Sequence, residues 1–336
     1  MSVEISGAEK TFGKHKAVNG VSVDLADGEF FVVLGPSGCG KSSLLRLVAG
    51  LERIDAGEVR LDGRLVSSPD VHVAPEDRAV GVVFQSYALW PHMSVRDNVA
   101  FPAEAGGASR AEARRQADRH LETVALGPLA ERQPAALSGG QRQRVALARC
   151  LAGGARTILM DEPLANLDPH LRGRMEVEIS RFHREAGVTT LYITHDQREA
   201  MALADRIAVM GEGHFLQVAP PQEIHDRPAT EAVARFIGQA AVLDAVVANG
   251  IARVGPLSAP VAAADGPARL VVRPGDVRLG DGTPARLEAA FYRGGGWEAR
   301  ARVEGLSEPI PVHATAPLRD GDTLRVTLSG GWVLPG

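Results

Sequence analysis

The sequence contains few cysteines, few aromatic residues and no long apolar run. Cys39 and Cys150 are the only cysteines among 336 residues, too few for a disulfide framework, which indicates a reducing compartment. Aromatic residues make up 4% of the chain, and the formal net charge of -4 provides no overall attraction to nucleic acid. The first ten residues, MSVEISGAEK, lack the basic and apolar segments of an export signal. Because no apolar segment is long enough to span a bilayer, we expect any membrane role to depend on a partner.

The composition that remains is typical of a globular protein with more than one domain. Hydrophobic residues make up 45% and charged residues 23% of the chain, which excludes disordered and fibrous classes. A chain of 336 residues can bury two separate hydrophobic cores.

The N-terminal half alternates between predicted strands and helices. Short apolar segments predict strands at residues 3–12, 21–25, 30–34, 59–61, 64–66, 157–160 and 190–194. Asp62-Gly63 predicts a hairpin turn, and Ser109 with Glu112 predicts a capping box at the start of a helix that ends near Gly127. Another helix is expected around 172–185. This order indicates an α/β core with a parallel sheet, an antiparallel β subdomain, and a helical subdomain inserted at about 86–155.

The composition changes after about residue 238 to alanine, valine, glycine and proline. Residues 297–305 and 323–334 alternate between apolar and polar side chains, as half-exposed antiparallel strands do. We therefore expect a first domain at 1–238 and a small all-β domain at 239–336.

A glycine-rich segment, GPSGCGKS, follows the predicted strand at 30–34 and precedes a predicted helix. This context is the one that a phosphate-binding P-loop requires, with Lys41 neutralising phosphate charge and Ser42 holding Mg²⁺. Cys39 is either a reactive thiol at a helix N-terminus or simply a small loop residue. The predicted phosphate-contacting residues are Gly35, Pro36, Ser37, Gly38, Cys39, Gly40, Lys41, Ser42 and Ser43.

Polar residues follow three other apolar strands. Asp161 and Glu162 end the segment TILMDE, where Asp161 can bind the Mg²⁺ shell and Glu162 can act as the general base that activates water. Gln85 can bridge the metal and the attacking water, and His195 can stabilise γ-phosphate charge. Each of the last two is also compatible with a satisfied polar cap at a strand end.

A second potential phosphate site begins the helix in LSGGQRQRVALARCLA. The turn at Ser138, Gly139 and Gly140 precedes free backbone N–H groups, which favour an anion. Because the P-loop already serves one nucleotide, we expect this turn to contact the γ-phosphate of ATP bound to a second copy. The sequence thus predicts a head-to-tail homodimer held by ATP.

Together, GPSGCGKS, Gln85, LSGGQ, MDEP, NLD and His195 resemble the motifs of the ATP-binding subunits of ABC transporters. The resemblance implies an ATPase with ATP and Mg²⁺ as cofactors. It also implies that Gln141 belongs to the signature and that Asp168 is the D-loop aspartate. Phe12 would stack on adenine, although it can equally be a core residue at a strand end.

Further segments at 75–95, 194–210, 233–238 and 271–279 resemble importer ATPases with a C-terminal OB-like domain of the TOBE type. This implies a peripheral subunit at the cytoplasmic face of the membrane that contacts permease subunits and, indirectly, a solute-binding protein. Residues 87–92 are the expected permease contact, or else part of the core. The β domain would bind a regulator or stabilise the dimer.

Among solutes, the resemblance slightly favours ferric iron, a polyamine or a sulfate-like anion over a sugar. A soluble ABC ATPase acting on chromosomes or ribosomes is the alternative, and we expect no nucleic-acid partner. The chain lacks the long heptad arms and the second nucleotide domain of those proteins.

Overall fold

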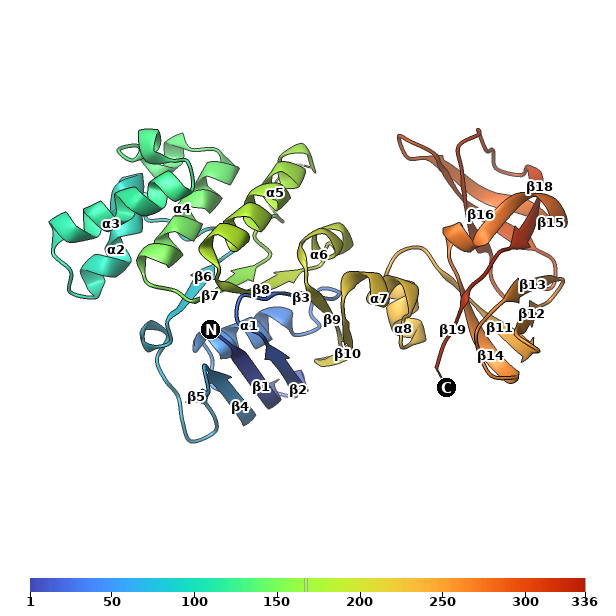
Figure 1. Ribbon diagram of the computed structural model, residues 1–336, viewed down its shortest axis with the longest axis horizontal. Coiled ribbons are helices and arrows are strands. Elements are labelled where there is room, and N and C mark those ends of the chain that lie inside the picture. The colour runs from blue at the N-terminus through green and yellow to red at the C-terminus, as the bar shows by residue number, and fades with distance from the viewer. Residues whose placement is uncertain (166, 168, 336) are drawn as a thin grey trace. The chain divides into compact units, whose positions relative to one another are not determined.

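The computed structural model describes residues 1–165, 167 and 169–335, without the side chains of residues 169 and 170. The chain forms two compact units, Met1–Pro221 and Gln222–Gly336 (Figure 1). This division precedes the predicted boundary at 238, because α8 (Glu231–Phe236) packs against strand β11 (Ala241–Ala248) of the second unit. In addition, the Arg235 guanidinium donates two hydrogen bonds, of 3.0 and 2.9 Å, to the Glu308 carboxylate.

The first unit contains an antiparallel sheet of four strands in the order β2-β1-β4-β5. Its strands are β1 (Val3–Phe12), β2 (His15–Leu25), β4 (Ala56–Leu61) and β5 (Arg64–Ser67). The predicted turn joins β4 to β5, with Leu61 paired to Arg64. Asp62 and Gly63 have φ angles of 47° and 73°, the left-handed pair that a tight hairpin turn requires.

The second sheet of this unit has six strands in the order β10-β9-β3-β8-β7-β6, and all its pairs except β9 with β10 are parallel. Its strands are β3 (Phe30–Leu34), β6 (Val80–Val83), β7 (Thr157–Asp161), β8 (Thr189–Thr194), β9 (Arg206–Gly211) and β10 (His214–Ala219). Three further helices of the unit are α1 (Lys41–Ala49), α5 (Pro169–Ala186) and α6 (Gln197–Leu203), and a short 3₁₀ turn η1 (Pro75–Asp77) precedes β6. The predicted α/β core is confirmed.

A group of helices is inserted between β6 and β7 and lies at one end of the unit (Figure 1). It comprises α2 (Val95–Ala105), α3 (Arg110–Thr123), η2 (Gly127–Leu129), η3 (Pro134–Ala136) and α4 (Gly139–Ala152). The capping box predicted at α3 is only half formed. Ser109 accepts from the Glu112 N–H at 3.3 Å, but the Glu112 carboxylate pairs with Arg115 instead of returning to Ser109.

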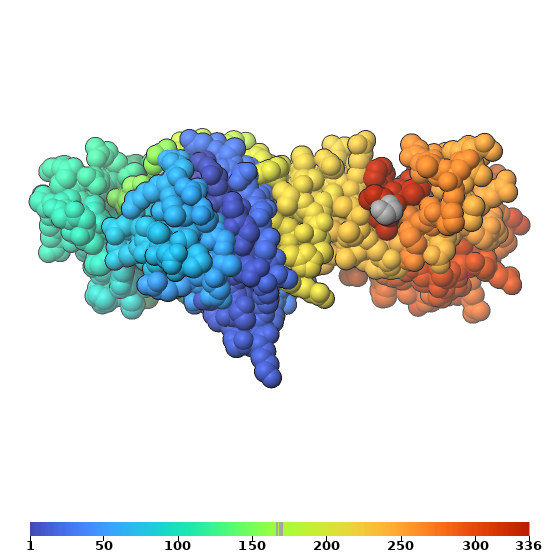
Figure 2. All heavy atoms as spheres, turned by 90° about the horizontal axis from the view of Figure 1, so that it is seen from below, coloured from blue at the N-terminus to red at the C-terminus, as the bar shows by residue number. Residues whose placement is uncertain are grey.

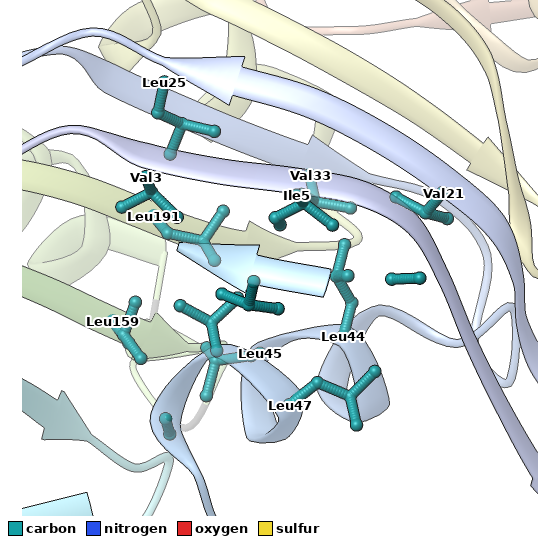
Figure 3. Close-up of a cluster of buried hydrophobic side chains, with 14 of the residues drawn as sticks. Val3, Ile5, Val21, Leu25, Val33, Leu44, Leu45, Leu47, Leu159 and Leu191 are labelled. Atoms are coloured by element: carbon teal, nitrogen blue, oxygen red, sulfur yellow. The ribbon is translucent and has the colours of Figure 1, made fainter. Parts of the chain in front are cut away.

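Helix α1 anchors the loop that precedes it through a buried leucine face. Figure 3 shows Leu44, Leu45 and Leu47 of α1 meeting apolar side chains from both sheets. Each of these leucines is at most 1% exposed, and burying such a side chain stabilises the fold by about 1.5–3 kcal/mol. The start of α1 is therefore held at a fixed place beside the end of β3.

Arg78 secures the other end of α1. Its guanidinium is 2% exposed and donates to the carbonyls of Leu47 and Val48 at 2.9 and 3.0 Å. It also donates to the Val66 carbonyl of β5 at 3.0 Å, which joins the helix to the antiparallel sheet. Burial lowers the pKa of Arg78 to about 10.

The second unit is mostly antiparallel β structure, as the composition change predicts. One sheet has the order β13-β12-β11-β14-β19 and the other β17-β16-β15-β18. The strands are β11 (Ala241–Ala248), β12 (Ile251–Val254), β13 (Leu257–Pro260), β14 (Gly266–Val272), β15 (Val277–Tyr292), β16 (Trp297–Val303), β17 (Ile310–Ala314), β18 (Thr323–Leu328) and β19 (Trp332–Val333). α7 (Pro221–Asp226) precedes α8, and η4 (Pro274–Asp276) precedes β15. Both sheets contribute to one core. In the described part of the chain, no helix is both long and apolar enough to cross a membrane.

Candidate functional site

The carboxyl ends of four parallel strands meet at one edge of the six-stranded sheet. Leu34 at the end of β3 pairs with Thr194, and Ile193 of β8 pairs with Asp161 at the end of β7. Met160 of β7 pairs with Val83 at the end of β6. The loops that begin at Gly35, Phe84, Glu162 and His195 therefore leave the sheet as neighbours, at the edge where open α/β sheets bind ligands.

The loop after β3 is shaped by glycine. Gly40 has a φ of 106°, and a Cβ there would lie 1.9 Å from the Ala17 carbonyl oxygen of β2. The first intrahelical bond of α1 runs from the Leu44 N–H to the Gly40 carbonyl at 2.9 Å. The N–H groups of the preceding residues have no acceptor within the helix, so they are available to an anion.

Lys41 lies inside this loop. Its side chain is 4% exposed, and Nζ donates to the carbonyls of Gly35 and Pro36 at 2.8 and 2.9 Å. The ammonium group is therefore held against the loop backbone, where phosphate groups would enter. The other predicted phosphate residues of the loop, Ser37 and Ser43 among them, lie along the same turn and the first turn of α1.

Cys39 is buried in this loop, 4.0 Å from Lys41 Nζ. Burial raises the pKa of its thiol, and the neighbouring lysine opposes this only in part. A raised pKa disfavours the thiolate. The interpretation of Cys39 as a small loop residue is therefore the better supported of the two.

Two predicted metal-side oxygens are already adjacent. The Ser42 hydroxyl donates to Oδ1 of Asp161 at 2.8 Å, joining the first turn of α1 to the end of β7. Hydroxyl and carboxylate oxygens are the hard ligands that Mg²⁺ prefers, usually alongside phosphate oxygens and water. These two groups thus fit a magnesium ion bound together with a nucleotide.

Glu162 and His195 form the next pair along the sheet edge. Oε2 of Glu162 lies 3.0 Å from Nδ1 of His195. Glu162 has a φ of 45°, a left-handed conformation that costs a non-glycine residue about 1–2 kcal/mol. Its N–H donates to the Ile193 carbonyl at 3.0 Å, which fixes the residue against β8. This conformation directs the carboxylate to the strand ends, beside the predicted metal residue.

Gln85 is exposed and lies two residues beyond the end of β6. The backbone that follows is unusual, because Tyr87 and Ala88 are both left-handed, with φ angles of 63° and 45°. Tyr87 is 5% exposed and Ala88 is exposed, so segment 87–92 combines core and surface positions.

The turn at the start of α4 forms a complete capping box. The Ser138 hydroxyl accepts from the Gln141 N–H at 3.3 Å, and Oε1 of Gln141 accepts from the Ser138 N–H at 2.9 Å. A Cβ at Gly139 or Gly140 would lie 2.8 Å from Cδ2 of Leu167 or 2.7 Å from Sδ of Met175, so a larger residue at either position would displace the end of that side chain. Among the described residues, no hydrogen bond or ion pair joins this turn to the loop at 35–42.

Phe12 lies at the end of β1, in the hairpin that projects as a narrow blue ridge in Figure 2. Its ring is 44% exposed, and Lys10 Nζ lies 5.4 Å from the ring centre. A residue this exposed is not part of the core, which leaves the ring accessible for stacking. Asp168 lies outside the described residues.

The sequence did not reveal the network that supports the His195 loop. Glu199 of α6 is 2% exposed and accepts from the hydroxyls of Tyr192 and Thr194 at 2.8 and 2.7 Å. Burial raises the pKa of Glu199. Arg172 of α5 donates to Asp196 at 2.8 Å and so links α5 to the same loop. The sequence signal for this network was the position of Glu199, in the first turn of the helix that follows Asp196. Ordinary helix capping explains a glutamate at that position equally well.

Several known proteins are similar to this chain. Residues 18–165 match the family described as ABC transporter. The chain is 40% identical over 333 residues to an sn-glycerol-3-phosphate import ATP-binding protein of Cereibacter sphaeroides, covering 96% of this chain and 94% of that protein. It is 42% identical over 303 residues to a spermidine/putrescine import ATP-binding protein of Pseudomonas aeruginosa, covering 87% and 82%.

A third relative is matched over a smaller part of its length. The chain is 48% identical over 242 residues to a trehalose/maltose import ATP-binding protein of Thermococcus litoralis, covering 71% of this chain but only 65% of that protein. A solved dimeric ATP-binding cassette, in a post-hydrolysis state with ADP and Pi, is similar with a TM-score of 0.57 and 30% identity. That similarity covers 65% of this chain and 98% of the cassette. The phosphate loop, the paired strand-end carboxylates and these relatives together show that the chain belongs to the ATP-binding subunits of ABC transporters, in the group of import ATP-binding proteins.

Proposed function

We propose that this ABC ATPase energises a membrane importer by closing as a homodimer on ATP. The observation that carries the proposal is the incomplete site of the single chain. The loop at 35–42 lies beside Asp161 and Glu162, whereas the glycine turn at 138–141 makes no hydrogen bond to that loop among the described residues. A second copy can supply that turn, and a related cassette has been solved as a dimer.

Within each site we assign roles by geometry. Lys41 and the loop N–H groups bind the phosphates, and Ser42, Asp161 and Gln85 would hold Mg²⁺, which supplies charge neutralisation. Glu162 accepts a proton from the attacking water. His195, 3.0 Å from that carboxylate, orients it and stabilises γ-phosphate charge.

The first test is hydrolysis by the purified full chain. Phosphate release from ATP should require added Mg²⁺ and should fall to background with excess EDTA. Ser42 and Asp161 provide only two of the oxygen ligands around the ion, so a chelator can remove it from the site. A colorimetric phosphate assay at fixed ATP, with and without EDTA, measures this. Hydrolysis that persists in EDTA would contradict the proposed metal role, and restoration by added Mg²⁺ is the control.

We also propose permease subunits as partners and the cytoplasmic face of the membrane as the location. Segment 87–92 supports this, since Ala88 is exposed whereas Tyr87 is buried, with its hydroxyl 3.5 Å from the Pro163 carbonyl oxygen. A solute-binding protein would act through the permease and not through this chain. Gln141 of the signature and Asp168 of the D-loop remain predicted nucleotide-binding residues.

The solute is proposed from the relatives. The slight preference for ferric iron or a sulfate-like anion finds no support, because the relatives described above are named for glycerol phosphate, polyamines and disaccharides. Polyamine, the third solute favoured by the sequence, remains a candidate. We therefore propose an organic solute, which is a polyamine, a polyol phosphate or a disaccharide.

Replacing Glu162 with glutamine in the native host is expected to abolish uptake of one organic solute. Radiolabelled putrescine, sn-glycerol-3-phosphate and maltose would be compared, with ferric iron and sulfate as solutes whose uptake should continue. A strain carrying Glu185→Gln, a change at an exposed glutamate, is the matched control. Loss of iron or sulfate uptake alone would overturn the assignment to organic solutes.

A further inference from the structure

The segment that follows Gln85 contains a conformation that needs external support. Tyr87 and Ala88 are consecutive non-glycine residues with positive φ angles of 63° and 45°. Side chains of L-residues disfavour this region, and two such residues in a row persist only when their surroundings hold them. Within the segment itself, the described support is one turn bond, from the Tyr87 N–H to the Phe84 carbonyl at 2.8 Å.

From outside the segment, the Asn98 amide bonds the backbone of Trp90, and the Tyr87 hydroxyl donates to the Pro163 carbonyl at 3.5 Å. Arg149 bonds the backbone of the two left-handed residues themselves. Its guanidinium donates to the Ala88 carbonyl through Nη1 at 2.6 Å and to the Tyr87 carbonyl through Nη2 at 3.0 Å. The flat fork of the guanidinium group thus bonds both left-handed residues at once. The Trp90 ring lies 5.0 Å from its central carbon and packs against Phe101 of α2 at 4.4 Å.

The burial of Arg149 favours its hydrogen bonds to this turn. The residue is 8% exposed, and no carboxylate in the described part of the chain forms an ion pair with it. A buried cation without a counter-charge needs hydrogen-bond acceptors, and the two carbonyls of the turn provide them. Arg149 lies in the last turn of α4, the helix whose first turn carries Ser138 to Gln141.

We propose that Arg149 is a positioning residue that holds the left-handed turn at Tyr87 and Ala88 and thereby sets the place of Gln85. The turn is then bonded directly to α4, the helix that begins with the glycine turn at 138–141. The Gln85 segment and the glycine turn should therefore move together. The inference rests on the proposed function only in taking Gln85 as part of the ATP site. The clamp, by which we mean the two hydrogen bonds from Arg149 to the carbonyls of Tyr87 and Ala88, forms without nucleotide.

Hydrogen exchange of the nucleotide-free full chain tests the clamp. In Arg149→Lys, one ammonium group replaces the fork, and we expect exchange in the peptide covering residues 84–91 to quicken by about 10-fold, the equivalent of one lost hydrogen bond. Arg144→Lys is the matched control, since Arg144 lies on the same helix and donates to the Val124 carbonyl at 2.9 Å. That variant should leave residues 84–91 unchanged.

Kinetics test the effect on the site. Arg149→Lys should lower kcat for ATP hydrolysis by about 10-fold, because a displaced Gln85 disturbs catalytic geometry. The dissociation constant for ATP should change less than about twofold, since no described hydrogen bond joins Arg149 to the phosphate loop. If the wild-type chain did not hydrolyse ATP, the proposed function would be overturned. The hydrogen-exchange result would still decide whether the clamp exists.

Rescue distinguishes this role from general support of the fold. Ala88→Gly removes the side chain that disfavours the left-handed angle, so adding it to Arg149→Lys should restore most of the slow exchange and of kcat. Unchanged exchange in Arg149→Lys, or failure of Ala88→Gly to rescue, would overturn the proposal. If Arg149→Lys does not fold, Arg149→Gln provides the decision, because a neutral side chain leaves no buried charge without a partner. We expect exchange in residues 84–91 to quicken by at least as much as in Arg149→Lys, and unchanged exchange would overturn the clamp.

Discussion

Replacing Glu162 with glutamine is expected to lower kcat for ATP hydrolysis between about 10²- and 10⁴-fold, the range that a general base contributes. The amide retains the size and hydrogen-bonding reach of the carboxylate toward His195, at 3.0 Å, but it cannot accept a proton from water. The dissociation constant for ATP should change little, because the phosphates bind at the loop of residues 35–42. Steady-state hydrolysis and fluorescent-nucleotide titration measure the two quantities separately.

Glu185→Gln, at an exposed position of α5, is the control and should hydrolyse ATP at the wild-type rate. If Glu162→Gln retained more than about a tenth of wild-type kcat, Glu162 would not be the base. Loss of ATP binding in the same variant would contradict the separation of roles, because the phosphates are assigned to the loop of residues 35–42.

Replacing Lys41 with alanine should have the larger effect on binding. Hydrogen bonds to charged groups contribute about 1.5–3 kcal/mol each, so loss of the ammonium from two phosphates should weaken ATP binding by about 10²-fold or more. Hydrolysis should fall to background, because the charge developing on the γ-phosphate also loses its nearest cation. Titration with a fluorescent nucleotide gives the affinity, and phosphate release gives the rate.

Arg46→Ala removes a cation from the exposed side of the same helix, and it should bind and hydrolyse ATP normally. Lys41 also bonds the carbonyls of Gly35 and Pro36, so the thermal midpoint of the variant must be measured beside its affinity. Tight ATP binding by a folded Lys41→Ala variant would show that the loop N–H groups suffice, contrary to the role given to this side chain.

The parts of the site that depend on local chemistry could be predicted from the sequence. The loop at 35–42 has few possible conformations, because it joins a buried strand to a helix that begins with Lys41 and Ser42. The structure has that strand, loop and helix. The Asp62-Gly63 turn was predicted for the same reason, since both residues tolerate a positive φ. Strand order brought Asp161 and Glu162 to this loop because parallel strands end at one edge of the sheet.

Features that depend on contacts distant in sequence could not be predicted. The bonds from Arg149 to the carbonyls of Ala88 and Tyr87 join residues 61 and 62 positions apart in the chain, and no local pattern encodes them. The Ser109 box is half formed because Glu112 has Arg115 within reach on its own helix. The unit boundary precedes the predicted one because packing of Arg235 on Glu308, not composition, decides where α8 belongs.

The central claim is that two copies of this chain close on ATP that both of them bind. Light scattering after gel filtration of Glu162→Gln, with Mg²⁺ and either ATP or ADP, tests it most directly. We expect twice the monomer mass of 35.5 kDa with ATP and the monomer mass with ADP, because only ATP offers a γ-phosphate to the glycine turn of the second copy. A monomer under both conditions, from a variant that still binds ATP, would contradict the shared site.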